Sequence, residues 1–111
     1  MPGKGEDIRK LYSFLGLCAR ARGLTSGETA VISAIKAGKA LLVLVAEDAS
    51  ENTKKMYADK CASHGADVLF FGEADAMGEA IGKNRRSAVA ITDPHFAEEL
   101  KKRVTLTTRE L

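Results

Sequence analysis

The four consecutive residues from Lys83 to Arg86 place three cations and one side-chain amide in a single short connector. Groups of this kind bind phosphate oxygens and donate hydrogen bonds to the edges of bases. The connector follows Gly82 and precedes an apolar stretch, so it is expected to be a loop between a helix and a strand. Composition alone favours a plainer interpretation, in which these residues form a solvated polar face.

A second candidate binding element surrounds Gly27. Ser26-Gly27-Glu28 is expected to open a helix, with Ser26 as the N-cap and an acidic residue in the first turn. Backbone N–H groups at a helix start point outward, and the missing side chain of Gly27 allows a partner to approach closely. Lys36 and Lys39 follow on this helix and just beyond it. If the two loops share one edge of a sheet, they form a cationic rim suited to a phosphate backbone.

The sequence contains few signs of a catalytic or metal-binding site. His64 and His95 do not combine with other residues into a nucleophile elbow, a zinc-protease motif or a Ser-His-Asp set. The stretch Gly78–Asn84 has three residues between its glycines where a Walker A loop has four, and Asn follows its lysine. A small enzyme using Glu47 and Asp48 stays a weaker alternative, because Asp48 is also explained as a helix cap. No catalytic residue, metal site or cofactor is predicted.

The cysteines and the amino-terminal residues indicate a cellular compartment. Cys18 and Cys61 are 43 positions apart without a CxxC pattern, so they are expected to be small core residues in a reducing environment. The first ten residues are too polar for a secretory signal. No apolar run approaches the ~20 residues that span a bilayer. We therefore expect a cytoplasmic protein without a membrane partner.

The formal charge of +2 conceals a strong segregation of charge along the 111 residues. Residues 1–39 carry seven basic and three acidic groups, a net of +4. Residues 40–80 carry three basic and eight acidic groups, a net of −5. Residues 81–111 carry seven basic and four acidic groups, a net of +3. The two candidate binding loops lie in the basic parts.

Hydrophobic periodicity predicts alternating helices and strands. Helices are expected at about 8–22, 27–37, 51–64, 74–81 and 94–102, and strands at 40–46, 67–71 and 87–92, with room for a short edge strand at 24–25. The continuous apolar strands indicate a sheet that is buried on both faces. The fold class is therefore α/β, a three-layer α-β-α sandwich whose small mixed sheet has about four strands.

End signals set the boundaries of these elements. Gly23 is expected to cap the first helix in a left-handed conformation, and Gly38 and Gly65 are expected to end the next two helices. Asp93 and Pro94 give an N-cap followed by proline at the first helical position. Residues 1–103 are expected to form one domain, and residues 104–111 a flexible tail.

Four blocks of sequence together resemble a known family. They are Leu24–Glu28, Ala34–Ala40, Leu44–Ser50 and Gly78–Gly82. In this order and register they resemble the kink-turn-binding ribosomal-protein superfamily of the L-seven-Ae and L-thirty-e type and, within it, the small bacterial YlxQ group. The resemblance runs from about Leu11 to Leu100.

This resemblance implies RNA binding without catalysis. Family members bind a kink-turn, a sharply bent helix–bulge–helix with tandem sheared G·A pairs, and proteins read such unstacked bases and unusual grooves. The implied partners are structured RNA, including ribosomal RNA, and ribosomal or other RNA-associated proteins. The resemblance and the basic residues of the two loops together predict one set of RNA-binding residues. These are Ser26, Gly27, Glu28, Thr29, Ala30, Ser33, Lys36, Gly82, Lys83, Asn84, Arg85 and Arg86.

An alternative is a protein-interaction module that keeps this fold without specific RNA recognition. Thr29, Ala30 and Ser33 stand where tightly binding members carry larger polar or basic side chains. Glu73 and Asp75 stand where some members are rich in lysine. These replacements keep the alternative open beside the RNA-binding hypothesis.

Overall fold

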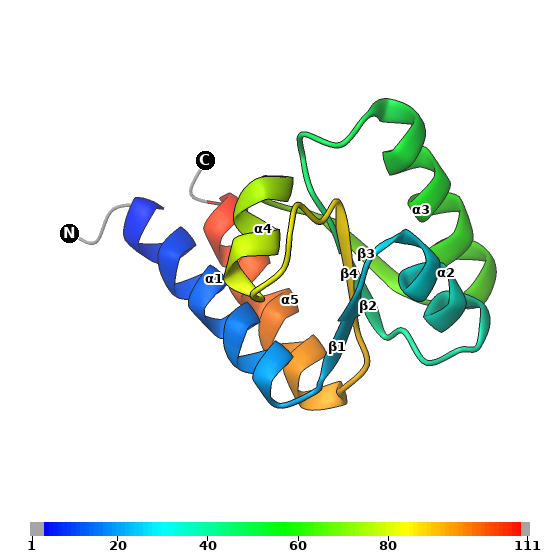
Figure 1. Cartoon of the computed structure of the whole chain (residues 1–111), viewed down its shortest axis with the longest axis horizontal. Coiled ribbons are helices and arrows are strands. Elements are labelled where there is room, and N and C mark those ends of the chain that lie inside the picture. The colour runs from blue at the N-terminus through cyan, green and yellow to red at the C-terminus, as the bar shows by residue number, and fades with distance from the viewer. Residues whose placement is uncertain (1–3, 110–111) are drawn as a thin grey trace.

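The computed structural model describes residues 4–109, and a four-stranded sheet forms their middle layer (Figure 1). Along the sheet the strand order is β1-β4-β2-β3. β4 is antiparallel to both of its neighbours, whereas β2 and β3 are parallel. The predicted mixed sheet is confirmed, including the short edge strand. The strands are β1 (Leu24–Ser26), β2 (Leu42–Val45), β3 (Asp67–Phe70) and β4 (Ala88–Ile91).

Helices cover both faces of the sheet, which confirms the three-layer architecture (Figure 1). One face is covered by α1 (Lys4–Arg20), α4 (Ala74–Ala80) and α5 (Pro94–Arg109). The other face is covered by α2 (Glu28–Lys36) and α3 (Glu51–His64).

The central strand β2 supplies side chains to both cores. Leu42 and Leu44 pack against the first group of helices, and Val43 and Val45 pack against the second. All four are fully buried, and each such burial stabilises the fold by ~1.5–3 kcal/mol relative to exposure. Alternation of side chains between the two faces explains why the sequence shows an unbroken apolar run here.

The expectation that the apolar strand at 67–71 is buried is wrong for β3. Its residues are exposed or half-buried, and 37% of Phe70 is exposed. The physical reason is the position of β3, which pairs with β2 and is the last strand of the sheet that the described residues form. The branched and aromatic residues identified a strand correctly but could not distinguish an edge from a centre.

The turn from α1 to β1 differs from the prediction. Arg22, with φ 59°, adopts the left-handed conformation expected of Gly23. Gly23 is required for another reason, because a Cβ atom there would collide with the ring of Phe96 on α5. The predicted N-cap is also wrong: Gly27 occupies that position, with φ 91° and no side-chain cap. Ser26 instead ends β1.

The last helix extends beyond its predicted end at Lys102. α5 continues to Arg109, and Val104, 2% exposed, packs in the first core. An apolar residue at this position is enough to keep the next turn of the helix on the sheet. Residues 104–109 are therefore helical rather than an irregular tail, and 110–111 lie outside the described residues. The mobility of 104–111 stays a prediction.

Two other helix starts and the two cysteines agree with the sequence. Ser50 caps α3, and its hydroxyl accepts a hydrogen bond from the Thr53 N–H. The carboxylate of Asp93 accepts hydrogen bonds from the first N–H groups of α5. Cys18 and Cys61 are buried free thiols in the two separate cores.

Candidate nucleic-acid interface

The two predicted binding loops meet at the edge of the sheet where β1 ends and β4 begins. β1 pairs antiparallel with β4, and Ser26 lies opposite Val89. This pairing brings the connector before β4 beside the end of β1. Arg86 Nε then donates a hydrogen bond of 3.1 Å to the Ser26 hydroxyl. The structure thus joins the segment at Gly27 to the basic connector.

The connector of residues 82–86 is held by backbone hydrogen bonds. Gly82, with φ 74°, ends α4 in the left-handed conformation, and the Lys83 N–H donates to the Gly78 carbonyl over 2.8 Å. This is the Schellman arrangement that closes many helices. At the other end of the connector, the Arg86 N–H donates to the Ala74 carbonyl over 3.1 Å. The loop is therefore tied to both ends of α4.

Gly78 allows this connector to lie directly against α4. A Cβ atom at Gly78 would collide with the backbone carbonyl of Asn84. Gly78, which opens the stretch that departs from the Walker A pattern, is therefore a close-packing position. Its role is to let Asn84 and its neighbours fold back along the helix.

The start of α2 is open to a partner. Apart from its two chain neighbours, no described residue lies within 4 Å of the place where a Cβ atom of Gly27 would stand, and the N-cap Gly27 provides no side-chain hydrogen bond to the helix. Thr29 and Ser33 are exposed, and their spacing of four residues places them on one face of α2. Backbone N–H groups and two hydroxyls therefore point outward at this edge.

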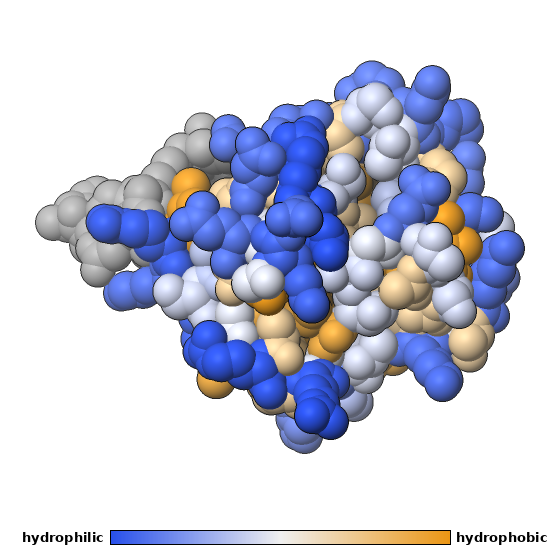
Figure 2. Space-filling view, viewed as in Figure 1, coloured by the Kyte–Doolittle hydropathy of each residue, from blue (hydrophilic) through white to orange (hydrophobic). Residues whose placement is uncertain are grey.

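A groove of about 820 Å³ lies beside the junction of the two loops. It contains three cations and one carboxylate beside small and apolar side chains. Three of its polar side chains are not among the predicted binding residues, namely Arg20 at the end of α1, Thr25 in β1 and Glu79 in α4. Figure 2 shows a band of strongly hydrophilic side chains over α4 and the connector that follows it. The groove is lined by Gly16, Ala19, Arg20, Leu24, Thr25, Ser26, Glu79, Ala80, Ile81, Gly82, Lys83 and Arg86.

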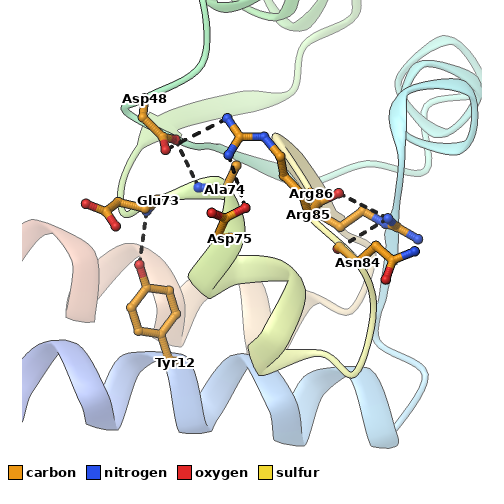
Figure 3. A network of polar contacts seen from close by, with 8 residues as sticks. All are labelled: Tyr12, Asp48, Glu73, Ala74, Asp75, Asn84, Arg85 and Arg86. Carbon is orange, nitrogen blue, oxygen red and sulfur yellow. Dashed lines mark hydrogen bonds and ion pairs between the residues drawn. The ribbon is translucent and has the colours of Figure 1, made fainter.

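Arg85 is directed to the opposite side of the connector from Arg86 (Figure 3). Its guanidinium forms an ion pair with Asp75 over 3.1 Å and lies 3.9 Å from a carboxylate oxygen of Asp48. Asp48 also accepts a hydrogen bond of 2.9 Å from the Ala74 N–H at the start of α4. The sequence correctly suggested that Asp48 is a cap, but the helix it caps is α4 and not the adjacent α3.

The structure does not bring Lys36 to the two loops. Lys36 is the last residue of α2, and Gly27 precedes the first. A helix of this length separates its two ends by ~13 Å. Lys39 lies beyond that same far end. A contact of Lys36 with RNA therefore stays a prediction for a more distant part of the ligand.

The described residues contain few groups that are arranged for catalysis or metal binding. Among residues that the structure describes, no three His, Cys, Asp or Glu side chains are grouped so that they could hold a metal ion. His64 Nδ1 lies 3.1 Å from the Lys60 carbonyl of its own helix. Asp48 is engaged as a cap and in an ion pair. In the same part of the chain, no helix is both long and apolar enough to cross a membrane.

Comparison with known proteins decides the family. The sequence profile of the ribosomal protein L7Ae/L30e/S12e/Gadd45 family matches residues 9–101. The chain belongs to this family. The match includes both loops of the interface and leaves out residues 1–8 and 102–111.

Two known proteins are similar to this chain over most of their length. The RNA-binding protein YlxQ of Bacillus subtilis (strain 168) is 43% identical over 89 residues, which cover 80% of this chain and 89% of that protein. The RNA-binding protein YlxQ of Enterococcus faecium is 39% identical over 94 residues, covering 84% and 89%.

Solved structures share the fold. A protein with unknown function from Bacillus halodurans C is 38% identical, with a TM-score of 0.82, and the match covers 86% of this chain and 97% of that one. The 15.5kD RNA binding protein of Giardia lamblia has a TM-score of 0.72 over 96% of this chain and 91% of its own. At 19% identity this second likeness shows the fold alone.

Proposed function

We propose that this chain is a non-enzymatic RNA-binding protein that recognises a kink-turn or a similarly structured RNA and associates with ribosomes. The observation that carries the proposal is the hydrogen bond between Arg86 and Ser26, because it unites two loops with complementary RNA-binding features. Family membership and relatives named as RNA-binding proteins support the same conclusion.

The start of α2 suits the widened groove of a bent RNA. Gly27 has no side chain to hold an RNA strand away, and the backbone N–H groups behind it are uncapped. Thr29 and Ser33 add hydroxyl groups that donate to and accept from base edges. Protein side chains read RNA bases where the helix is irregular, and sheared G·A pairs provide such a place.

The groove beside the connector suits an unstacked nucleotide. Its apolar lining, including Leu24 and Ile81, gives a base a surface to pack on. Lys83, Arg86 and Arg20 surround this surface with positive charge for the phosphates. Basic groups around an apolar floor are the pattern by which proteins bind splayed-out bases.

The decisive experiment measures binding of the full chain to a kink-turn RNA and to the same RNA with its G·A pairs replaced. We expect the first RNA to bind more tightly, because the replacement closes the groove that the start of α2 would enter. Equal affinities would reject kink-turn recognition while leaving RNA binding. A lack of binding to either RNA at low salt would reject RNA as the ligand and would favour the protein-interaction module.

Ribosome association requires a separate measurement. We expect the chain to sediment with ribosomal subunits at low salt and to leave them as the salt concentration rises, because phosphate contacts weaken with salt. Sedimentation that persists after ribonuclease treatment would instead indicate a protein partner. The expected cytoplasmic location follows from the same proposal.

A further inference from the structure

We propose that Asp48 and Asp75 hold the Arg85 guanidinium and so weaken its contact with phosphates, which lowers the affinity of the chain for polyanions in general. The proposal deepens the proposed function and rests on it for its biological meaning. The interaction itself involves the side chains of Asp48, Asp75 and Arg85, so a polyanion that contains no RNA can test it.

The geometry places Arg85 between two carboxylates. Arg85 Nη1 lies 3.1 Å from Asp75 Oδ1, and Nη2 lies 3.9 Å from Asp48 Oδ2. The three side chains are all accessible, with exposed fractions of 53% for Arg85, 79% for Asp75 and 42% for Asp48. Exposed ion pairs of this kind contribute little to folding stability. A phosphate can therefore compete with the carboxylates for the guanidinium.

The local charge around Arg85 is negative. Its single positive charge faces the two carboxylates of Asp48 and Asp75, whereas the Glu73 carboxylate is directed away from Arg85 (Figure 3). The Tyr12 hydroxyl accepts a hydrogen bond from the Glu73 N–H, and its pKa is raised by burial and by the nearby carboxylates of Glu73 and Asp48. A phosphate that approaches Arg85 therefore also meets a repulsive field.

The neighbouring Arg86 is arranged differently. Within residues 4–109, its guanidinium donates hydrogen bonds to neutral oxygens, namely the Ser26 hydroxyl and the carbonyls of Asn84 and Arg85. Its positive charge is consequently not compensated by these partners. The two adjacent arginines thus contribute unequally to the attraction of phosphates. Arg86 presents a full positive charge, whereas carboxylates already neutralise part of the charge of Arg85. Suppressing general attraction is one way in which a protein gains selectivity.

The variant that tests this is Asp75→Asn, compared with Asp59→Asn. Both changes raise the net charge by one, and both remove an exposed carboxylate that pairs with one cation, since Asp59 lies 3.0 Å from Lys55 on α3. The probes are a heparin column eluted with salt and an unstructured poly-uridine oligonucleotide. Heparin carries sulfates and no bases, so the retention of the protein on the column does not depend on kink-turn recognition.

We expect Asp75→Asn to bind the oligonucleotide about five- to tenfold more tightly at low salt, with a salt slope steeper by about 0.7, because one more phosphate contact forms on a single strand. It should also elute from heparin at higher salt than Asp59→Asn. Combining Asp75→Asn with Arg85→Ala should abolish both gains, because the carboxylate acts through Arg85.

Two results would overturn the proposal. Equal heparin elution of the Asp75→Asn and Asp59→Asn variants would show that only total charge matters. A gain that survives in the Arg85→Ala background would show that Asp75 repels polyanions directly. Failure of the proposed function would give another result. The wild-type chain would then bind the kink-turn RNA and its variant without G·A pairs equally well, while the heparin comparison would be unaffected.

Discussion

The guanidinium of Arg86 lies 3.1 Å from the hydroxyl of Ser26, although the two residues are 60 positions apart in the chain. This hydrogen bond links the connector before β4 to the segment that leads into α2. Both sides of the candidate interface therefore keep a fixed relation to each other. The strand pairing of β1 with β4 supports the same relation from the backbone.

Replacing Arg86 with alanine should weaken RNA binding by ~1–2 kcal/mol and reduce the salt slope by about 1, because one cationic contact is lost. Lys101→Ala is the matched control, since Lys101 is a basic residue of α5 that forms an ion pair with Asp67 of β3. Titration of both variants with the kink-turn RNA at several salt concentrations gives the comparison. A similar loss from the two variants would contradict a special role of Arg86.

Replacing Gly78 with alanine should destabilise the fold by ~1–3 kcal/mol, because the new methyl group must displace the Asn84 carbonyl. Glu79→Ala changes an exposed residue next to it and should alter the free energy of unfolding by no more than ~0.5 kcal/mol. Urea unfolding of both variants measures the difference. Equal stability of the two variants would mean that the connector moves away from α4 without cost.

The two variants Asp48→Ala and Asp48→Asn separate the cap of α4 from the charge of the carboxylate. Alanine removes the acceptor of the Ala74 N–H and should lower the free energy of unfolding by ~1 kcal/mol. Asparagine keeps an oxygen at that position and should recover most of the stability. Thermal unfolding tests this order, and an asparagine variant as unstable as the alanine variant would show that charge matters more than the hydrogen bond.

The stability of the fold should decrease at alkaline pH because of Cys18. Burial, followed by the nearby carboxylate of Asp93, raises the pKa of this thiol to about 11. The folded chain retains a proton that the unfolded chain releases above about pH 9, so the stabilisation is present below that pH and is lost as the pH rises towards 11. The expected slope is ~1.4 kcal/mol per pH unit for this group.

Urea unfolding between about pH 8 and about pH 10 measures that slope. Cys18→Ala removes the ionising group and should flatten the dependence, whatever its effect on stability at neutral pH. An unchanged slope in this variant would assign the effect to the other buried thiol, Cys61, whose pKa is also raised by burial.

Local signals in the sequence predicted most of the fold. The apolar run at β2 and the cap at Asp93 depend on neighbouring residues, and the structure confirms them. Errors arose where a distant element decides the outcome. Arg22 takes the left-handed conformation expected of Gly23, and Gly23 lies against Phe96, a contact that no local pattern contains.

The candidate site shows the same division. The residue types of both loops were visible in the sequence, but their connection through Arg86 and Ser26 depends on which strands pair. Arg20 could have been noted as a cation at the end of an amphipathic helix, yet only the fold brings it to the groove. The opposite directions of Arg85 and Arg86 had no signal in the sequence, because they depend on carboxylates supplied by the ends of other elements.

The backbone hydrogen bonds that tie residues 82–86 to α4 have an entropic consequence. A loose loop must lose conformational freedom when it closes on a ligand, and that loss is subtracted from the binding energy. Here the Lys83 and Arg86 N–H groups are already bonded to α4 in the free chain. Most of the ordering has thus taken place during folding. A ligand of this loop gains the benefit of its contacts with little further cost in backbone entropy.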